Sequence, residues 1–135
     1  MADSSDKSLG RAGRKLGLRV PEPDFEEGES IRWEDRANRF KGKVWAVGGG
    51  LFLTNRRLIF VPNKIESKIF FGKTWSADLG DLDRAFVGGG LLKTVRVVDR
   101  DGGTSRFVIG ARKTATARIN AAIRTAKPRA ALRTE

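Results

Sequence analysis

Two short stretches of the sequence are rich in basic residues whose chemistry suits an anionic ligand. The first holds Arg36, Arg39, Lys41 and Lys43, and the second holds Lys64, Lys68 and Lys73. Several cations that share one phosphate-rich ligand form charge-assisted hydrogen bonds to it at the same time. Phe70 and Phe71 lie between the lysines of the second stretch, and apolar tips flanked by cations are typical of segments that enter a lipid interface. The alternative interpretation is a solvated rim, with both phenylalanines folded beneath it as core.

The sequence offers no coherent catalytic set. It contains no histidine and no cysteine, which removes the commonest general base near neutral pH and the thiolate nucleophile. Asp78, Asp81 and Asp83 have the spacing of a turn in which Leu79 and Leu82 are buried and the carboxylates cap backbone N–H groups. We therefore expect no enzymatic activity, no catalytic residue and no cofactor.

Two further motifs are better explained as turns and bends than as ligand sites. Asp99-Arg-Asp-Gly102 resembles the start of a calcium loop, but Gly103 replaces the third acidic ligand and no glutamate closes the twelve-residue frame. Gly48–Gly50 is not followed by Gly-Lys-Ser/Thr, so it is not a phosphate-binding loop. We expect a hairpin turn at the first motif, no bound metal, and a bulge, bend or close backbone approach at the second.

The charge balance favours anionic partners without choosing among them. The 135 residues carry 27 Lys and Arg against 16 Asp and Glu, a net charge of +11. Residues 112–135 hold 7 basic residues and 1 acidic residue, and their net charge is more than half of the excess positive charge. An excess of this kind raises encounter rates with anionic lipid, acidic protein and nucleic acid alike. The N-terminal residues contain no apolar run typical of a signal peptide, and no segment is long and apolar enough to span a membrane. We expect a cytoplasmic protein.

The apolar pattern predicts about seven short strands followed by one helix. The apolar runs Leu51–Leu53 and Leu58–Val61 flank Thr54-Asn-Arg-Arg57, which indicates a tight central hairpin with its arginines serving the turn, one of them exposed and one along the sheet. Pro62 should end the second strand or lie on an edge. Residues 44–47 lead through Gly48–Gly50 into the first strand of this hairpin, and the further predicted strands are 31–36, 74–77, 84–87, 93–98 and 104–109. Apolar residues at helical spacing predict an amphipathic helix over 112–126, which Pro128 ends.

The middle of the chain resembles a GRAM domain. The matching pieces are Gly48-Gly-Gly-Leu-Phe-Leu-Thr-Asn-Arg-Arg-Leu-Ile-Phe60, Trp75-Ser-Ala-Asp-Leu-Gly-Asp-Leu82, and Asp101-Gly102 before Phe107-Val108. The family pattern has an apolar strand ending in Leu-Thr, a turn, an Arg-Leu-x-Phe strand and a downstream Leu-x-Asp-Leu. The resemblance covers about residues 25–126, and over this range the chain is similar to compact single-domain bacterial members of the family. It implies a mainly β, pleckstrin-homology-like fold, which is a seven-stranded barrel or orthogonal sandwich capped by a C-terminal helix.

The same resemblance implies where a ligand would bind. In the pleckstrin-homology-like fold the binding end is built from the loops after strands one, three and six, which here are Arg36–Lys43, Asn63–Lys73 and Asp99–Gly103. The two basic stretches would then meet at one end of the domain.

We predict a flexible tail over residues 1–24, the domain over 25–126 and a basic tail over 127–135. The predicted function is a non-enzymatic module that binds an anionic membrane surface or lipid headgroup, at the inner face of the membrane. Two alternatives remain. One is a protein-interaction adaptor that binds an acidic partner or uses the open edge of the barrel or the groove beside the helix. The other is non-specific nucleic-acid binding through residues 112–135.

Overall fold

A computed structural model describes residues 20–41, 45–63 and 73–126. These residues form seven strands, one 3-10 turn and one helix. The elements are β1 (Ile31–Lys41), β2 (Trp45–Thr54), β3 (Arg57–Pro62), β4 (Trp75–Asp78), η1 (Leu79–Asp81), β5 (Leu82–Gly88), β6 (Thr94–Asp99), β7 (Thr104–Val108) and α4 (Arg112–Thr125). The predicted mainly β architecture with one C-terminal helix is confirmed.

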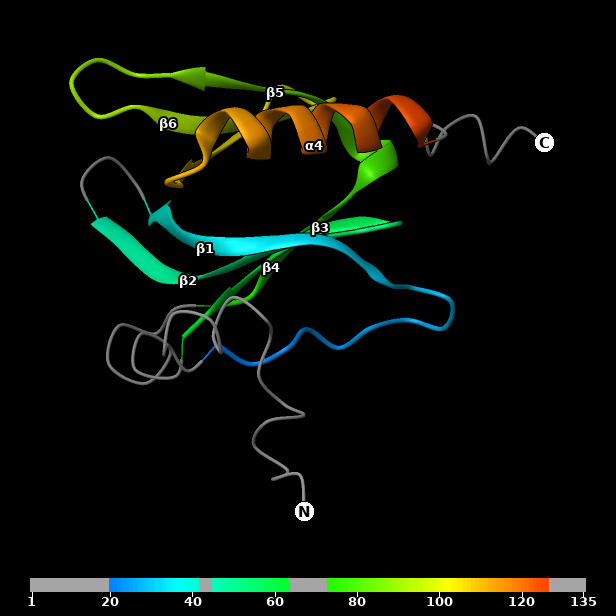
Figure 1. The fold of residues 1–135 in the computed structure, drawn as a ribbon. Helices are drawn as coiled ribbons and strands as arrows, with labels where there is room; N and C mark the ends of the chain where they lie inside the picture. Colours follow the sequence, from blue (N-terminus) through cyan, green and yellow to red (C-terminus); the bar gives the residue numbers. More distant parts are fainter. Residues whose placement is uncertain (1–19, 42–44, 64–72, 127–135) are drawn as a thin grey trace.

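The seven strands form one antiparallel sheet in the order β4-β3-β2-β1-β7-β6-β5. β1 pairs with β7 and so joins the two halves of the sheet, with Asn38 opposite Val108 and Arg39 opposite Phe107. Figure 1 shows β1–β4 as one layer and β5, β6 and α4 as the other. The strand order ends at β4 and β5 with no pairing between them, so the sheet is folded over without closing into a barrel. α4 packs on β5 and β6.

The central hairpin is buried on both faces, which explains its continuous apolar runs. Leu51, Leu53, Leu58 and Phe60 point into the core between the layers. Phe52, Ile59 and Val61 form a second cluster with Val20 on the opposite face. A strand covered on both sides lacks the usual alternation of apolar and polar residues. Val20 is fully buried, so the packed part of the chain includes a residue before position 25.

The turn between β2 and β3 is the predicted tight reversal. Two residues, Asn55 and Arg56, separate the strands. The Thr54 hydroxyl accepts hydrogen bonds from the N–H groups of Arg56 (3.0 Å) and Arg57 (2.9 Å). β3 ends at Pro62, as the missing N–H of proline predicts.

Two local predictions need correction. β1 continues through Lys41, so Arg36, Arg39 and Lys41 lie in a strand rather than in a loop. β2 runs through Gly48–Gly50 without a register shift. The expected bulge is therefore absent from these residues, and the expected close backbone approach is correct. A Cβ on Gly49 would meet the Val61 carbonyl and lie 2.8 Å from the Pro62 Cα. Glycine is required there because β3 passes too close for a side chain.

The remaining turns and the helix follow their sequence signals. Leu79 and Leu82 are buried around η1 as predicted, although the Asp78 side chain forms no cap hydrogen bond there. In the β6–β7 hairpin Gly102 has φ +92°, and the Asp99 Oδ1 accepts from the N–H groups of Asp101 (3.0 Å) and Gly103 (2.8 Å). The buried face of α4 consists of Ala115, Ile119 and Ile123.

Candidate functional site

Three of the predicted anion-binding side chains lie in the described part of the chain. They are Arg36, Arg39 and Lys73. Lys41 ends β1, and its side chain is not described. Lys43, Lys64, Lys68, Phe70 and Phe71 lie outside the described residues. The prediction that all of these groups converge therefore stays a prediction, and only the first three are placed.

Arg36 and Arg39 lie on opposite faces of β1, because side chains alternate along a strand. Arg36 is exposed and borders a shallow hollow with Asp35 and Asn38. Arg39 is three residues further on and turns toward the inside of the folded sheet, where its guanidinium carbon lies 5.4 Å from the centre of the Trp75 ring. The structure thus separates these two arginines.

Arg39 and Lys73 share one recess at the end of the domain. Its volume is about 190 Å³, and it is lined by Arg39, Val47, Phe60, Lys73, Thr74 and Trp75. The aromatic wall of the recess is positioned by strand pairing, because Phe60 of β3 is opposite Trp75 of β4. Trp75 also packs on Phe107, with ring centres 5.5 Å apart. A rigid aromatic surface therefore holds the Arg39 guanidinium at the recess.

The Arg39 side chain is only partly solvated. Burial lowers the pKa of its guanidinium from the usual value, yet an arginine remains protonated in proteins. Its Nε is buried and has no hydrogen-bond partner among the described residues. A buried donor without an acceptor carries an energetic penalty that an anionic ligand would remove.

Arg56 and Arg57 serve the turn, as predicted. The Arg56 side chain is about half exposed and lies 3.5 Å from Glu26. Arg57 is largely buried, and its Nε and Nη2 donate to Glu29 at 2.9 and 2.7 Å. The hydrogen bond from Arg57 lowers the pKa of Glu29 to about 2. This ion pair anchors residues 24–30 to the central hairpin and leaves no role for Arg57 in ligand binding.

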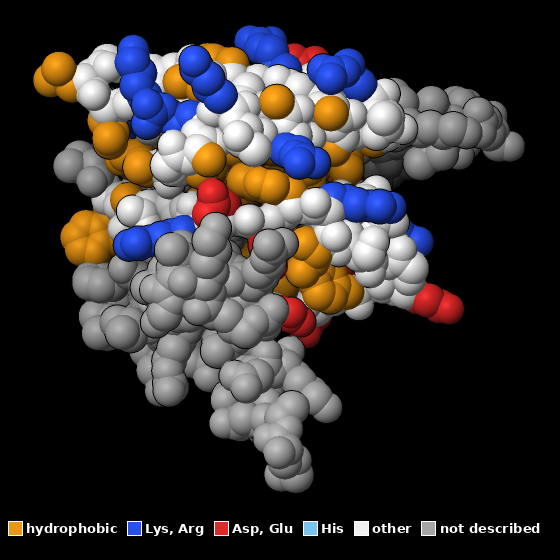
Figure 2. Space-filling model, viewed as in Figure 1, with side chains coloured by type: hydrophobic (Ala, Val, Ile, Leu, Met, Phe, Trp, Pro, Cys, Tyr) orange, Lys and Arg blue, Asp and Glu red, His pale blue; other side chains and the backbone are white. Residues whose placement is uncertain are grey.

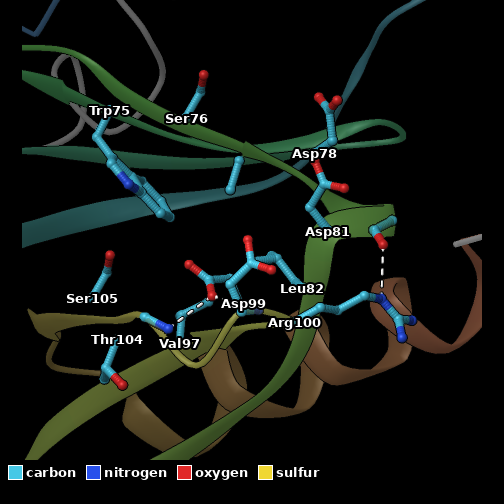
Figure 3. Close-up of a pocket in the computed structure, with 14 residues that line it drawn as sticks. Trp75, Ser76, Asp78, Asp81, Leu82, Val97, Asp99, Arg100, Thr104 and Ser105 are labelled. Carbon is cyan, nitrogen blue, oxygen red and sulfur yellow. Dashed lines mark hydrogen bonds between the residues drawn. The ribbon is translucent and has the colours of Figure 1, made fainter. Parts of the chain in front are cut away.

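A larger hollow lies elsewhere and is lined mainly by acidic charged side chains. A groove of about 960 Å³ separates β4 from the β6–β7 hairpin, with η1 at one end. Figure 3 shows Asp78 and Asp81 on one side and Asp99 on the other. The hairpin is fixed to η1 because the N–H and Nε of Arg100 donate to the carbonyls of Asp81 and Gly80, both at 2.9 Å. The third predicted loop, Asp99–Gly103, therefore borders an acidic groove that repels anions.

The loop between β5 and β6 is apolar and exposed, which the sequence did not predict. Leu91 is fully exposed and Leu92 is 55% exposed. Trp45, at the start of β2, is 51% exposed. The signal was present as two adjacent leucines between a triple glycine and Lys93, but without the fold nothing distinguishes such a pair from core residues.

The charged side chains of the second layer are basic except at the start of β5 and the end of β6, where Asp83 and Asp99 lie. Residues 84–98 and 104–126 contain no Asp or Glu. Figure 2 shows Lys and Arg side chains over the face formed by α4, β5 and β6, with apolar side chains projecting at the end where the β5–β6 loop lies. Among the described residues, no group of three or more acidic side chains is arranged to hold a metal ion. No helix in the described ranges is long and apolar enough to cross a membrane.

Comparison with solved structures identifies the fold. The C-terminal domain of an unknown protein from Leishmania infantum superposes with a TM-score of 0.61 at 13% identity, over 85% of this chain and 94% of that one. The DH/PH domains of a mutant of p115-RhoGEF superpose with a TM-score of 0.61 at 15% identity, over 73% of this chain and 32% of that one. The chain has a pleckstrin-homology-like fold. No family model matches the chain, and no curated protein matches it in sequence.

A fold does not by itself define a function. At these identities the similarity establishes the fold alone, so the function has to be argued from the site.

Proposed function

We propose that the chain is a non-enzymatic binding module that docks at the surface of an anionic membrane and holds a phosphate-bearing headgroup in the recess of Arg39 and Lys73. The observation that carries the proposal is this recess, in which two cations from distant parts of the sequence meet at an aromatic wall. The pleckstrin-homology-like fold and the GRAM-like motif over residues 48–60 support a binding role. The protein would act peripherally, at the inner face of the membrane.

The size of the recess limits the ligand. Pockets for small molecules usually enclose about 300–1,000 Å³, whereas this recess has about 190 Å³. A space of this size suits one charged group, such as a phosphate on a lipid, rather than an entire soluble metabolite. A headgroup presented by a bilayer meets this condition because the rest of the lipid stays in the membrane.

Neighbouring residues complete the proposed membrane-facing end. Trp45 precedes Val47 by two positions and so lies on the same face of β2, toward the recess. Tryptophan favours the boundary between lipid and water. Lys41, Lys43, Lys64 and Lys68 belong to the segments that lead into or follow this end, and in the proposal they attract the anionic surface. Phe70 and Phe71 are proposed to contact the membrane.

Sedimentation with lipid vesicles tests the proposal. The wild-type protein is expected to bind vesicles of phosphatidylcholine with 30 mol% phosphatidylserine, to bind pure phosphatidylcholine weakly, and to lose affinity as salt rises. The double variant Arg39→Met, Lys73→Glu should bind the anionic vesicles at least tenfold more weakly. Methionine keeps an apolar stem on Trp75, so the wall of the recess is preserved.

A matched control separates the recess from overall charge. Arg118→Met, Arg124→Glu makes the same change in net charge on the solvent side of α4, where both residues are exposed. This control should retain most of the affinity. Equal binding of the wild-type protein to both kinds of vesicle would refute the proposal, and so would equal losses in the two double variants.

A further inference from the structure

The β5–β6 loop holds two leucines away from the protein. Gly89 has φ +111°, and a Cβ there would collide with the Leu92 carbonyl. The Lys93 Nζ donates to the Gly89 carbonyl at 3.4 Å, which closes the loop. Leu91 and Leu92 are therefore kept in solvent by the shape of the loop. We call Leu91 and Leu92 the leucine tip.

A row of aromatic and basic side chains crosses four strands beside the leucine tip. Phe86 of β5 is opposite Arg96 of β6, and Arg96 is opposite Arg106 of β7. The guanidinium carbon of Arg106 lies 4.7 Å from the centre of the Phe40 ring of β1. The row places two arginines between two aromatic rings on the outer face of the sheet.

Arg96 and Arg106 border a hollow that also contains an unsatisfied donor. The hollow has a volume of about 410 Å³, and Phe40, Thr94, Leu92 and the glycines of the loop complete its lining. The Arg96 Nε is buried and has no hydrogen-bond partner among the described residues. An anion in the hollow would accept a charge-assisted hydrogen bond from this group and remove the penalty of a buried donor.

The surroundings favour a lipid surface as the occupant. The acidic residues Asp78, Asp81, Asp99 and Asp101 line the groove between β4 and the β6–β7 hairpin, whereas residues 84–98 are free of Asp and Glu. Figure 1 shows the β5–β6 loop projecting at the end of the domain where β1 ends and β2 begins. Phe40 follows Arg39 directly in β1 and points to the opposite face of the strand, so this surface and the recess lie on the two sides of the end of β1. Apolar tips bordered by cations and aromatic rings match the layered chemistry of a bilayer interface.

We infer that the protein inserts the leucine tip into an anionic bilayer, at the boundary of headgroups and acyl chains, with a lipid phosphate between Arg96 and Arg106. This inference rests on the proposed function and adds a second, apolar contact at a separate surface. Phe40 and Phe86 lie at headgroup depth on either side of the arginine pair. The inserted leucines fix the orientation of the domain, and the recess of Arg39 and Lys73 then faces the same membrane.

Flotation with vesicles of phosphatidylcholine and 30 mol% phosphatidylserine tests the insertion. Leu91→Ser, Leu92→Ser is expected to lower the partition coefficient at least tenfold without changing the melting temperature, because Leu91 and Leu92 are exposed. Phe25→Ser is the control, since Phe25 is also exposed but precedes Glu26 and Glu27. Arg96→Gln, Arg106→Gln should reduce the preference for anionic over neutral vesicles more than Arg112→Gln, Arg118→Gln on α4.

A fluorescent probe reports insertion directly. The chain has no cysteine, so Leu91→Cys can be labelled at one site with an environment-sensitive dye. The emission should shift to the blue when anionic vesicles are added, and brominated lipids should quench it. The same dye at Asp101→Cys, on the β6–β7 hairpin, should show neither effect.

The outcomes separate the two proposals. The insertion is overturned if the wild-type protein binds vesicles and the partition coefficient of Leu91→Ser, Leu92→Ser differs from it by less than twofold. It is also overturned if the dye at position 91 shows no blue shift. Either result leaves the recess proposal standing. Loss of binding in the leucine variant with no preference for anionic lipid supports insertion of the leucine tip, and it overturns both phosphate contacts, in the recess and between Arg96 and Arg106. No binding to either vesicle overturns both. If the wild-type protein binds no vesicles but forms a dimer, and the leucine variant is monomeric, the leucine tip serves self-association instead.

Discussion

Replacing Glu29 by glutamine removes the ion pair that fastens residues 24–30 to the central hairpin. The Glu29 side chain is fully buried and that of Arg57 is 16% exposed. The carboxylate accepts hydrogen bonds from Arg57 Nη2 at 2.7 Å, the Thr54 hydroxyl at 2.6 Å and the Glu26 N–H at 3.0 Å. Glutamine has nearly the same shape but lacks the charge, so Arg57 would keep a buried cation with a weaker partner.

The shifted pKa of Glu29 gives the expected size of the effect. Its value falls from 4.5 to about 2, chiefly through the hydrogen bond from Arg57. At about 1.4 kcal/mol per pKa unit, this difference corresponds to roughly 3 kcal/mol of folding stability. Because the pKa is lowered in the folded state, this stability is fully present above about pH 4.5 and is lost as the pH falls through about 2.

Urea denaturation at several pH values measures this contribution. At pH 7 the Glu29→Gln variant should be about 3 kcal/mol less stable than the wild-type protein, and the gap should narrow steadily between pH 4.5 and pH 2. Glu27→Gln, at an exposed neighbour, should change the stability by less than about 0.5 kcal/mol. A gap below about 1 kcal/mol at pH 7, or a gap independent of pH, would show that the ion pair does not hold this segment.

Two further predictions concern close contacts between elements. Gly49→Ala should destabilise the protein by about 1–3 kcal/mol, because its Cβ would meet the backbone of β3. Gly110→Ala, where an added carbon meets open space, should be neutral in the same urea titration; equal effects would contradict the close approach. Asn120 of α4 donates to the Ala85 carbonyl and accepts from the Ala85 N–H of β5, both at 2.8 Å. Asn120→Leu should therefore cost about 1–3 kcal/mol and expose the Ala85 amide to faster hydrogen exchange, and unchanged exchange would refute the role of this pair.

Local patterns predicted most of the elements because their causes are local. The apolar runs around Thr54–Arg57 specified the central hairpin, and Asp101-Gly102 specified the β6–β7 turn, where Gly102 takes a positive φ. The helical spacing of Ala115, Ile119 and Ile123 specified the helix and its buried face. Propensity, periodicity and turn chemistry act over a few residues, so a single sequence is enough to reveal them.

Strand length and the path through Gly48–Gly50 could not be predicted in the same way. The polar residues Arg36 and Arg39 suggested a loop, but pairing with β2 and β7 keeps them in β1. The three glycines suggested a bulge, a bend or a close approach. The strand runs through them without a register shift, and the backbone of the paired strand β3 is too close to Gly49 for a side chain. In both places tertiary pairing overrides the local preference.

The candidate sites depended on the tertiary structure more than the fold did. The sequence by itself determined the supply of cations, the absence of histidine and cysteine, and the order of strands and helix. The folded chain decided which cations share a surface. It places Arg39 and Lys73 in the lining of one recess with Trp75, turns Arg36 to the other face, and pairs Arg96 with Arg106 beside Leu92. A binding surface is set by strand register and by the crossing of the two layers. These bring residues far apart in the chain together, and no local pattern encodes them.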